Sequence, residues 1–106
     1  MTGTITALRY QKRDTERVNV YIDGQFAFGL AAILAARLRV GQTLSGDEIA
    51  KYRVQDDVEK AHGRALNFLS YRPRSEYEVR QYVRKRDLYE DIIDSVVERL
   101  TRADLV

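Results

Sequence analysis

The sequence predicts an α+β fold, in which an N-terminal three-stranded antiparallel sheet, or β-hairpin, with a short helix precedes a helical region that ends in three helices. Three observations support this class. Residues 1–30 are rich in β-branched side chains and contain the turn dipeptide Asp23-Gly24. From Ala31 onward, apolar residues recur three and four positions apart, as in helices that bury one face. Two serines each precede a glutamate by three residues, a pattern typical of helix starts.

We expect the strands over residues 4–10 and on both sides of Asp23-Gly24, within residues 17–30. A two-residue hairpin loop needs a positive φ at both central positions, which Gly24 adopts freely and Asp23 tolerates. This loop places Tyr21 opposite Phe26 and Ile22 opposite Gln25. One face of the sheet then carries Asn19, Tyr21, Phe26 and Phe28, and the other carries Val18, Val20 and Ile22.

Two helical stretches follow the sheet. Residues 31–38 are rich in alanine and leucine, which predicts a short buried helix that covers the sheet and ends at the turn Val40-Gly41. The pattern Ser45-x-x-Glu48 starts a helical stretch whose apolar residues continue to Leu69. The run Asp56-Asp57-Val58-Glu59 resembles a second cap, so this stretch forms either one long helix or two.

Two further helices complete the second half of the chain. The pattern Ser75-x-x-Glu78 follows Pro73 and starts a helix that runs to about Arg86. The last helix has an unbroken apolar stripe, formed by Ile92, Ile93, Val96, Val97 and Leu100. We therefore expect two domains, residues 1–55 with the hairpin and its covering helices and residues 56–106 with three helices, joined without a flexible linker.

The composition excludes several classes of function. The chain of 106 residues has no cysteine and a single histidine, His62, which leaves no disulfide, no thiolate zinc site and no histidine pair. We expect no catalytic residue, no bound metal and no cofactor. The longest apolar stretch, residues 26–38, is shorter than the roughly 20 residues that a bilayer span needs. The N-terminus lacks a secretory signal, so we expect a cytoplasmic protein without a membrane partner.

Charge is strongly segregated in the second half, although the net charge of the whole chain is only +2. Residues 72–86 carry a net charge of +4, and residues 87–98 carry five acids and no base. One account is that the helix ends carry the charges that their dipoles favour and that neighbours pair. The other account is a binding surface for phosphates or for an acidic protein face. This candidate surface comprises Arg72, Arg74, Arg80, Arg84, Lys85 and Arg86.

Other candidate residues have simpler explanations. Four tyrosines near the basic segment can stack nucleobases, but at helical spacing such residues more often pack. They are Tyr71, Tyr77, Tyr82 and Tyr89. Glu90 and Asp94 lie four residues apart and can share a metal or a proton, but a solvated face is favoured. His62 is expected to be structural. A DNA-binding helix-turn-helix is only weakly supported, because DNA would repel the acidic last helix.

The run Arg64-Ala-Leu-Asn-Phe-Leu-Ser-Tyr-Arg-Pro-Arg-Ser-Glu76, with Glu78-Val-Arg80 and Val96-Val-Glu-Arg-Leu100 after it, resembles the first helical repeat of the RecX proteins, bacterial regulators of the RecA recombinase. The resemblance covers about residues 58–106. The segment Arg17 to Leu30 is similar to the β-hairpin extension of some members. The resemblance implies a curved module of three-helix repeats that docks into the groove of the RecA–DNA filament and inhibits strand exchange and ATP hydrolysis.

Three features depart from the family pattern. Asp87 stands where the family usually has glycine, and aspartate tolerates the positive φ of such a turn. Tyr89 lies near the usual polar cap of the third helix. The chain ends at Val106, where the family normally continues into further repeats, so we expect an N-terminal fragment or a truncated member.

The resemblance and the charge pattern together predict a monomeric, non-enzymatic regulator of DNA repair and recombination that inhibits the RecA filament through the six basic residues, with single- or double-stranded DNA as an additional partner. One alternative is a nucleic-acid-binding helical module that acts without RecA. Another is a structural adaptor whose exposed hairpin pairs strands with a partner or with a second copy of itself.

Overall fold

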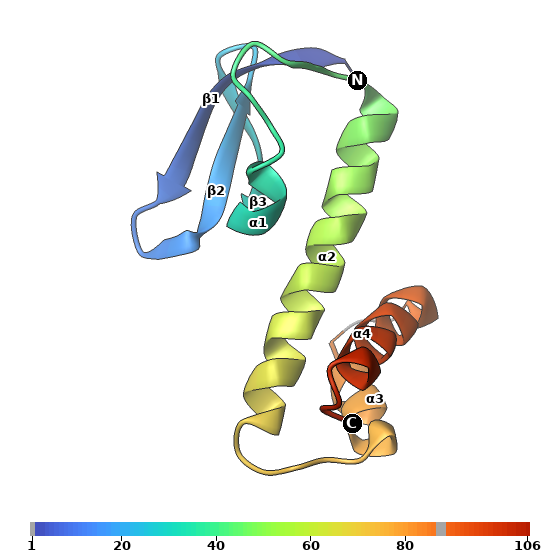
Figure 1. The fold of residues 1–106 in the computed structure, drawn as a ribbon. Coiled ribbons are helices and arrows are strands. Elements are labelled where there is room, and N and C mark those ends of the chain that lie inside the picture. The colour runs from blue at the N-terminus through green and yellow to red at the C-terminus, as the bar shows by residue number, and fades with distance from the viewer. Residues whose placement is uncertain (1, 87–88) are drawn as a thin grey trace. The chain divides into compact units, whose positions relative to one another are not determined.

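The computed structural model describes residues 2–86 and 89–106 and contains two compact units, Met1–Asp56 and Asp57–Val106 (Figure 1). The first unit contains a sheet, a short helix and the first half of a long helix. The second unit contains the rest of that helix and two further helices. The predicted α+β class is confirmed.

The sheet has four antiparallel strands in the order β3-β2-β1-β4. The strands are β1 (Gly3–Gln11), β2 (Asp14–Ile22), β3 (Gln25–Ala31) and β4 (Thr43–Leu44). The first three strands were predicted, whereas β4 was not. Strand β4 pairs with Gly3 and Thr4. It is only two residues long, which is too short to show the alternation of apolar and polar residues by which a strand is predicted.

The hairpin between β2 and β3 has the predicted turn and the predicted first pairs. Asp23 has a φ of 51° and Gly24 a φ of 84°, so both central residues adopt the left-handed conformation. Tyr21 pairs with Phe26, and Ile22 pairs with Gln25. The ring of Tyr21 also meets the ring of Phe26 edge-on, with 6.0 Å between their centroids.

The predicted face of Phe28 is wrong. The pairing shifts between Val20 and Tyr21, because β3 has one extra residue at Ala27 and Phe28 pairs with Val20. A side chain on a regular strand would alternate faces, whereas this bulge turns Phe28 to the side of Val20. Phe28 is buried there, while Phe26 is 58% exposed.

The helix predicted over residues 31–38 is shorter in the structure. Helix α1 contains only Ala32–Ala35, and Ile33 is 65% exposed. The turn at Gly41, with a φ of 94°, lies where it was predicted. The first core is formed by Ile5, Val18, Val20, Ile22, Phe28, Leu30, Leu34, Ala35, Leu38, Leu44 and Ile49.

A single helix, α2 (Gly46–Leu69), follows the sheet. It begins with the predicted capping box, since the backbone N–H of Glu48 donates to Ser45 Oγ over 3.1 Å and the backbone N–H of Ser45 donates to Glu48 Oε1 over 2.9 Å. The run Asp56-Asp57-Val58-Glu59 does not start a second helix. Asp56 is buried instead, where its carboxylate binds Arg17 and a backbone N–H.

The second unit combines the end of α2 with α3 (Glu76–Arg84) and α4 (Glu90–Arg102). Ser75 and Glu78 form the predicted capping box of α3, which ends two residues before Arg86. The second core comprises Ala61, Ala65, Val79, Val83, Ile92, Ile93, Val96, Val97 and Leu100, including the whole predicted stripe of α4. None of the helices in the described part of the chain has both the length and the apolar character of a membrane span.

Candidate functional site

Helix α3 has three faces with different roles. Val79 and Val83 are buried in the core of the second unit. Arg80 and Arg84 lie one turn apart on a second face, which meets α4. The third face lines a groove, and its residues are described below.

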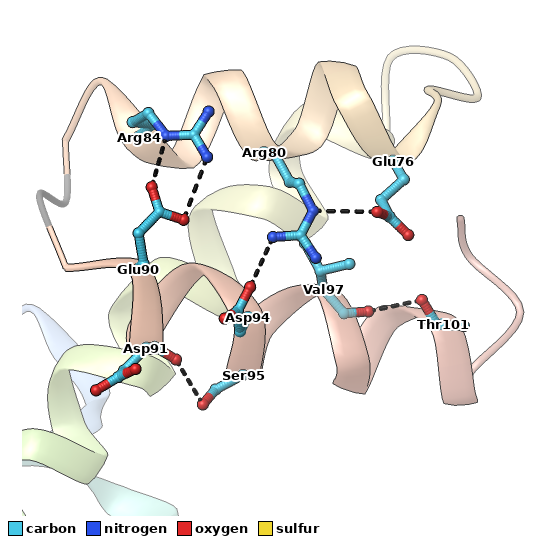
Figure 2. Close-up of polar contacts among 9 residues, drawn as sticks. All are labelled: Glu76, Arg80, Arg84, Glu90, Asp91, Asp94, Ser95, Val97 and Thr101. Atoms are coloured by element: carbon cyan, nitrogen blue, oxygen red, sulfur yellow. Dashed lines mark hydrogen bonds and ion pairs between the residues drawn. The ribbon is translucent and has the colours of Figure 1, made fainter.

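Both arginines that face α4 form ion pairs with acidic side chains (Figure 2). Arg80 Nε donates to Glu76 over 3.1 Å, and Arg80 Nη1 donates to Asp94 over 2.7 Å. The hydrogen bond that Arg80 donates to Asp94, and to a smaller extent the one it donates to Glu76, raises the pKa of Arg80. Arg84 holds Glu90 with a guanidinium fork, at 3.0 Å from Nε and 3.3 Å from Nη2.

Two further arginines surround Glu78 at the start of α3. Arg72 Nη2 lies 2.7 Å from Glu78 Oε2, and Arg74 Nη1 lies 4.0 Å from the same oxygen. Glu78 also accepts the backbone N–H of Ser75 over 3.2 Å. The hydrogen bond from Arg72 and then that from Ser75 lower the pKa of Glu78. Glu78 therefore stays ionised and neutralises part of the basic segment.

Lys85 and Arg86 differ from the other four candidate residues in their ion pairing. Neither Lys85 nor Arg86 forms an ion pair with an acid in the described ranges 2–86 and 89–106, and both are exposed. Arg86 lies over the ring of Tyr82, with 4.7 Å between the guanidinium carbon and the ring centroid. The basic segment thus divides into four arginines with acidic partners and two cations that face solvent.

These ion pairs support the first account of the charge segregation, in which neighbouring basic and acidic residues neutralise one another. Glu90 and Asp94 lie on an exposed face, as expected, and they also pair with Arg84 and Arg80. Within the residues that the structure describes, no group of three or more side chains is arranged to hold a metal ion. His62 is half-buried. Its burial, and to a smaller extent the positive charge of Arg99, lowers its pKa. Asp87 lies outside the described residues.

The expected packing of the tyrosines is wrong for three of the four. Tyr71, Tyr77 and Tyr89 are more than 70% exposed. Only Tyr82 packs, edge-on against Phe68 with 4.1 Å between ring centroids. Helical spacing suggested packing for Tyr77, but that residue lies on the face of α3 that turns away from the core.

This third face of α3 borders a surface groove of about 480 Å³. The groove was not predicted, because Phe68 comes from the end of α2 and only the fold brings it beside α3. The recurrence of Tyr77, Gln81 and Lys85 at four-residue intervals is the one sequence signal for its long wall. Its lining consists of Phe68, Tyr77, Glu78, Gln81, Tyr82, Lys85 and Arg86.

Comparison with known families assigns both halves of the chain. Residues 3–45 match the family model described as the regulatory protein RecX N-terminal domain. Residues 61–100 match the model described as RecX, first three-helix domain. The two matches fall within the first and the second compact unit, respectively.

Individual relatives give the same result. The chain is 40% identical to the regulatory protein RecX of Bacillus velezensis over 98 residues, which are 91% of this chain and 37% of the relative. It is 38% identical to that of Halalkalibacterium halodurans over 108 residues, which are 96% of this chain and 41% of the relative. The chain thus spans about two fifths of the length of these relatives.

A solved structure extends the likeness to three dimensions. A crystal structure of regulatory protein RecX superimposes with a TM-score of 0.88 at 30% sequence identity, over 98% of this chain and 52% of that one. The resemblance that the sequence suggested is confirmed. The chain therefore belongs to the RecX family, of which it contains the N-terminal domain and the first three-helix domain.

Proposed function

We propose that this chain binds the RecA–DNA filament and inhibits it, and that it acts by binding and not by catalysis. Membership of a family of regulatory proteins is the observation that carries this proposal. The inhibitory action and the contact surface are inferences from the family and from the charges on α3. The relatives are longer than the part that this chain matches, so the activity of a whole relative comes to this chain only as a proposal.

We propose a graded role for the six basic residues. Lys85 and Arg86 have no acidic partner among the described residues, so they can contact a partner without breaking an ion pair. Arg72, Arg74, Arg80 and Arg84 would exchange their present acids for acids or phosphates of the filament. Exposed ion pairs are worth only about 0–1 kcal/mol, so this exchange costs little.

A retention assay tests the partner and the surface separately. RecA filaments assembled on immobilised single-stranded DNA are compared with the same DNA without RecA. The wild-type chain should be retained more strongly by the filament, and it should slow ATP hydrolysis by RecA. Lys85→Gln combined with Arg86→Gln should weaken retention about tenfold, since two charge-assisted contacts are lost.

Two further variants complete this test. Lys51→Gln combined with Arg53→Gln makes the same charge change at exposed positions of the first unit and should leave retention unchanged. Asp94→Asn removes an acid from Arg80 and should strengthen retention. Equal binding of the wild-type chain to filament and bare DNA would overturn the RecA partner. Equal retention of the wild-type chain and the Lys85/Arg86 variant would overturn the surface.

A further inference from the structure

Strand β3 forms one edge of the sheet, and part of this edge is open. The order β3-β2-β1-β4 leaves the outer side of β3 without a partner strand among the described residues. At the C-terminal end of β3 the edge is covered by α2, because the backbone N–H of Ala31 donates to Asp56 over 2.8 Å. Towards its other end, β3 and the first turns of α2 line a groove of about 750 Å³. This edge groove lies entirely within the first compact unit.

Backbone groups of β3 face the outer edge at two positions. The residues that flank a two-residue hairpin loop exchange hydrogen bonds, so Gln25 faces Ile22 and the N–H and C=O of Phe26 face outward. The N–H of Ala31 also faces outward, and since these directions alternate along a strand, so do the backbone groups of Gly29. An unpaired strand edge is a template for a further strand. The edge groove therefore offers main-chain hydrogen bonds to an extended backbone.

The walls of the edge groove are mainly apolar and include one cation. Phe26 is 58% exposed on the wall formed by β3, and Ile49 lies on the wall formed by α2. Arg53, one turn after Ile49, is exposed and forms no ion pair with an acid in the ranges 2–86 and 89–106. Asp23, the acid in the lining, accepts a backbone N–H of β1 over 3.1 Å. The groove thus favours a ligand that combines an apolar side chain with a carboxylate.

We propose that the edge groove binds an extended peptide segment of a partner protein, which adds to β3 as a further strand. One apolar side chain of the segment packs between Phe26 and Ile49, and an acidic side chain pairs with Arg53. The wall from Gly46 to Arg53 rises about 10 Å, which matches about three residues of a strand. A groove of this length is too short for a stable dimer, which buries about 1,200 Å² or more. This site is separate from the RecA filament surface proposed for α3.

Selection from a phage library of random heptapeptides on the immobilised chain supplies the probe. Enriched sequences should alternate apolar with polar residues and contain an acid. Binding of the most enriched peptide, made synthetically, is then measured by fluorescence anisotropy. N-methylation of every second residue removes the donors that face β3 in one phase and the donors that face solvent in the other. The first phase should weaken binding about tenfold, and the second should leave it unchanged.

Two variants with matched controls locate the peptide. Phe26→Ala should weaken peptide binding about tenfold, whereas Tyr10→Ala removes a similarly exposed ring outside the edge groove and should leave binding unchanged. Arg53→Glu should also weaken binding about tenfold. Lys51→Glu makes the same charge change outside the edge groove and should leave binding unchanged.

Four results would overturn the proposal. They are a selection that enriches no sequence, equal effects of the two N-methylation phases, equal binding by the wild type and Phe26→Ala, and equal binding by Arg53→Glu and Lys51→Glu. Sedimentation gives a further test. A dimer of the wild-type chain that Phe26→Ala dissociates would identify a second copy as the occupant of the groove, and that result would also overturn the proposal.

Discussion

At the scale of single residues, Asp56 is the main polar anchor of the first unit. Arg17 donates to both of its oxygens over 3.0 Å, and the backbone N–H of Ala31 donates to Oδ1 over 2.8 Å. Gly29 lies beside the Arg17 guanidinium, since a Cβ at that position would lie 3.4 Å from Arg17 Nη2, at van der Waals contact. One carboxylate thus connects β2, the end of β3 and α2.

Replacing this carboxylate should destabilise the first unit. Asp56→Ala leaves the partly buried Arg17 guanidinium and the Ala31 N–H without their acceptor, which should cost about 2–4 kcal/mol of unfolding free energy. Denaturant unfolding followed by circular dichroism measures this loss. Asp57→Ala changes the exposed neighbour and should cost less than about 0.5 kcal/mol. Equal losses for the two variants would show that burial of Asp56 is not the cause.

At the scale of elements, the capping boxes of α2 and α3 make stability depend on pH. Hydrogen bonds from the backbone and side chain of Ser45 lower the pKa of Glu48. A hydrogen bond from Arg72, and to a smaller extent one from the backbone of Ser75, lowers the pKa of Glu78. A carboxylate whose pKa is lower in the folded state stabilises the protein above its unfolded value of 4.5. This stabilisation is lost as the pH falls through the folded pKa.

Melting temperatures measured across the acidic range test this dependence. The wild-type melting temperature should be nearly constant above about pH 5 and should fall below it. Glu48→Gln combined with Glu78→Gln should fall less steeply, because its two caps carry no charge to lose. The remaining carboxylates titrate in both proteins, so the difference between the curves isolates the caps. Parallel curves would contradict a role of these two ionised groups.

Elements with a local chemical signal were predicted correctly, whereas the bulge in β3 and strand β4 were not. The Asp23-Gly24 turn and both capping boxes depend on residues within four positions of one another, which the sequence displays directly. The bulge at Ala27 depends instead on where Phe28 can be buried, and β4 depends on a distant partner strand. Such long-range packing leaves no periodic trace in a short segment.

At the scale of the whole molecule, the charge pattern was visible in the sequence but its pairing was not. Counting residues shows a basic segment before an acidic one. Only the packing of α3 against α4 shows that Asp94 and Glu90 engage Arg80 and Arg84, while Lys85 remains without an acid among the described residues. The groove was missed for the same reason, since Phe68 reaches it from another helix.

Two separate hydrophobic cores predict two units that unfold separately, although α2 runs from one into the other. Leu30 is completely buried in the first core and Leu100 in the second. Leu100→Ala should cost about 2–5 kcal/mol and speed amide hydrogen exchange in α4, while exchange in β2 stays unchanged. Leu30→Ala should have the opposite pattern. Faster exchange in both elements for either variant would mean that α2 couples the cores into one cooperative unit.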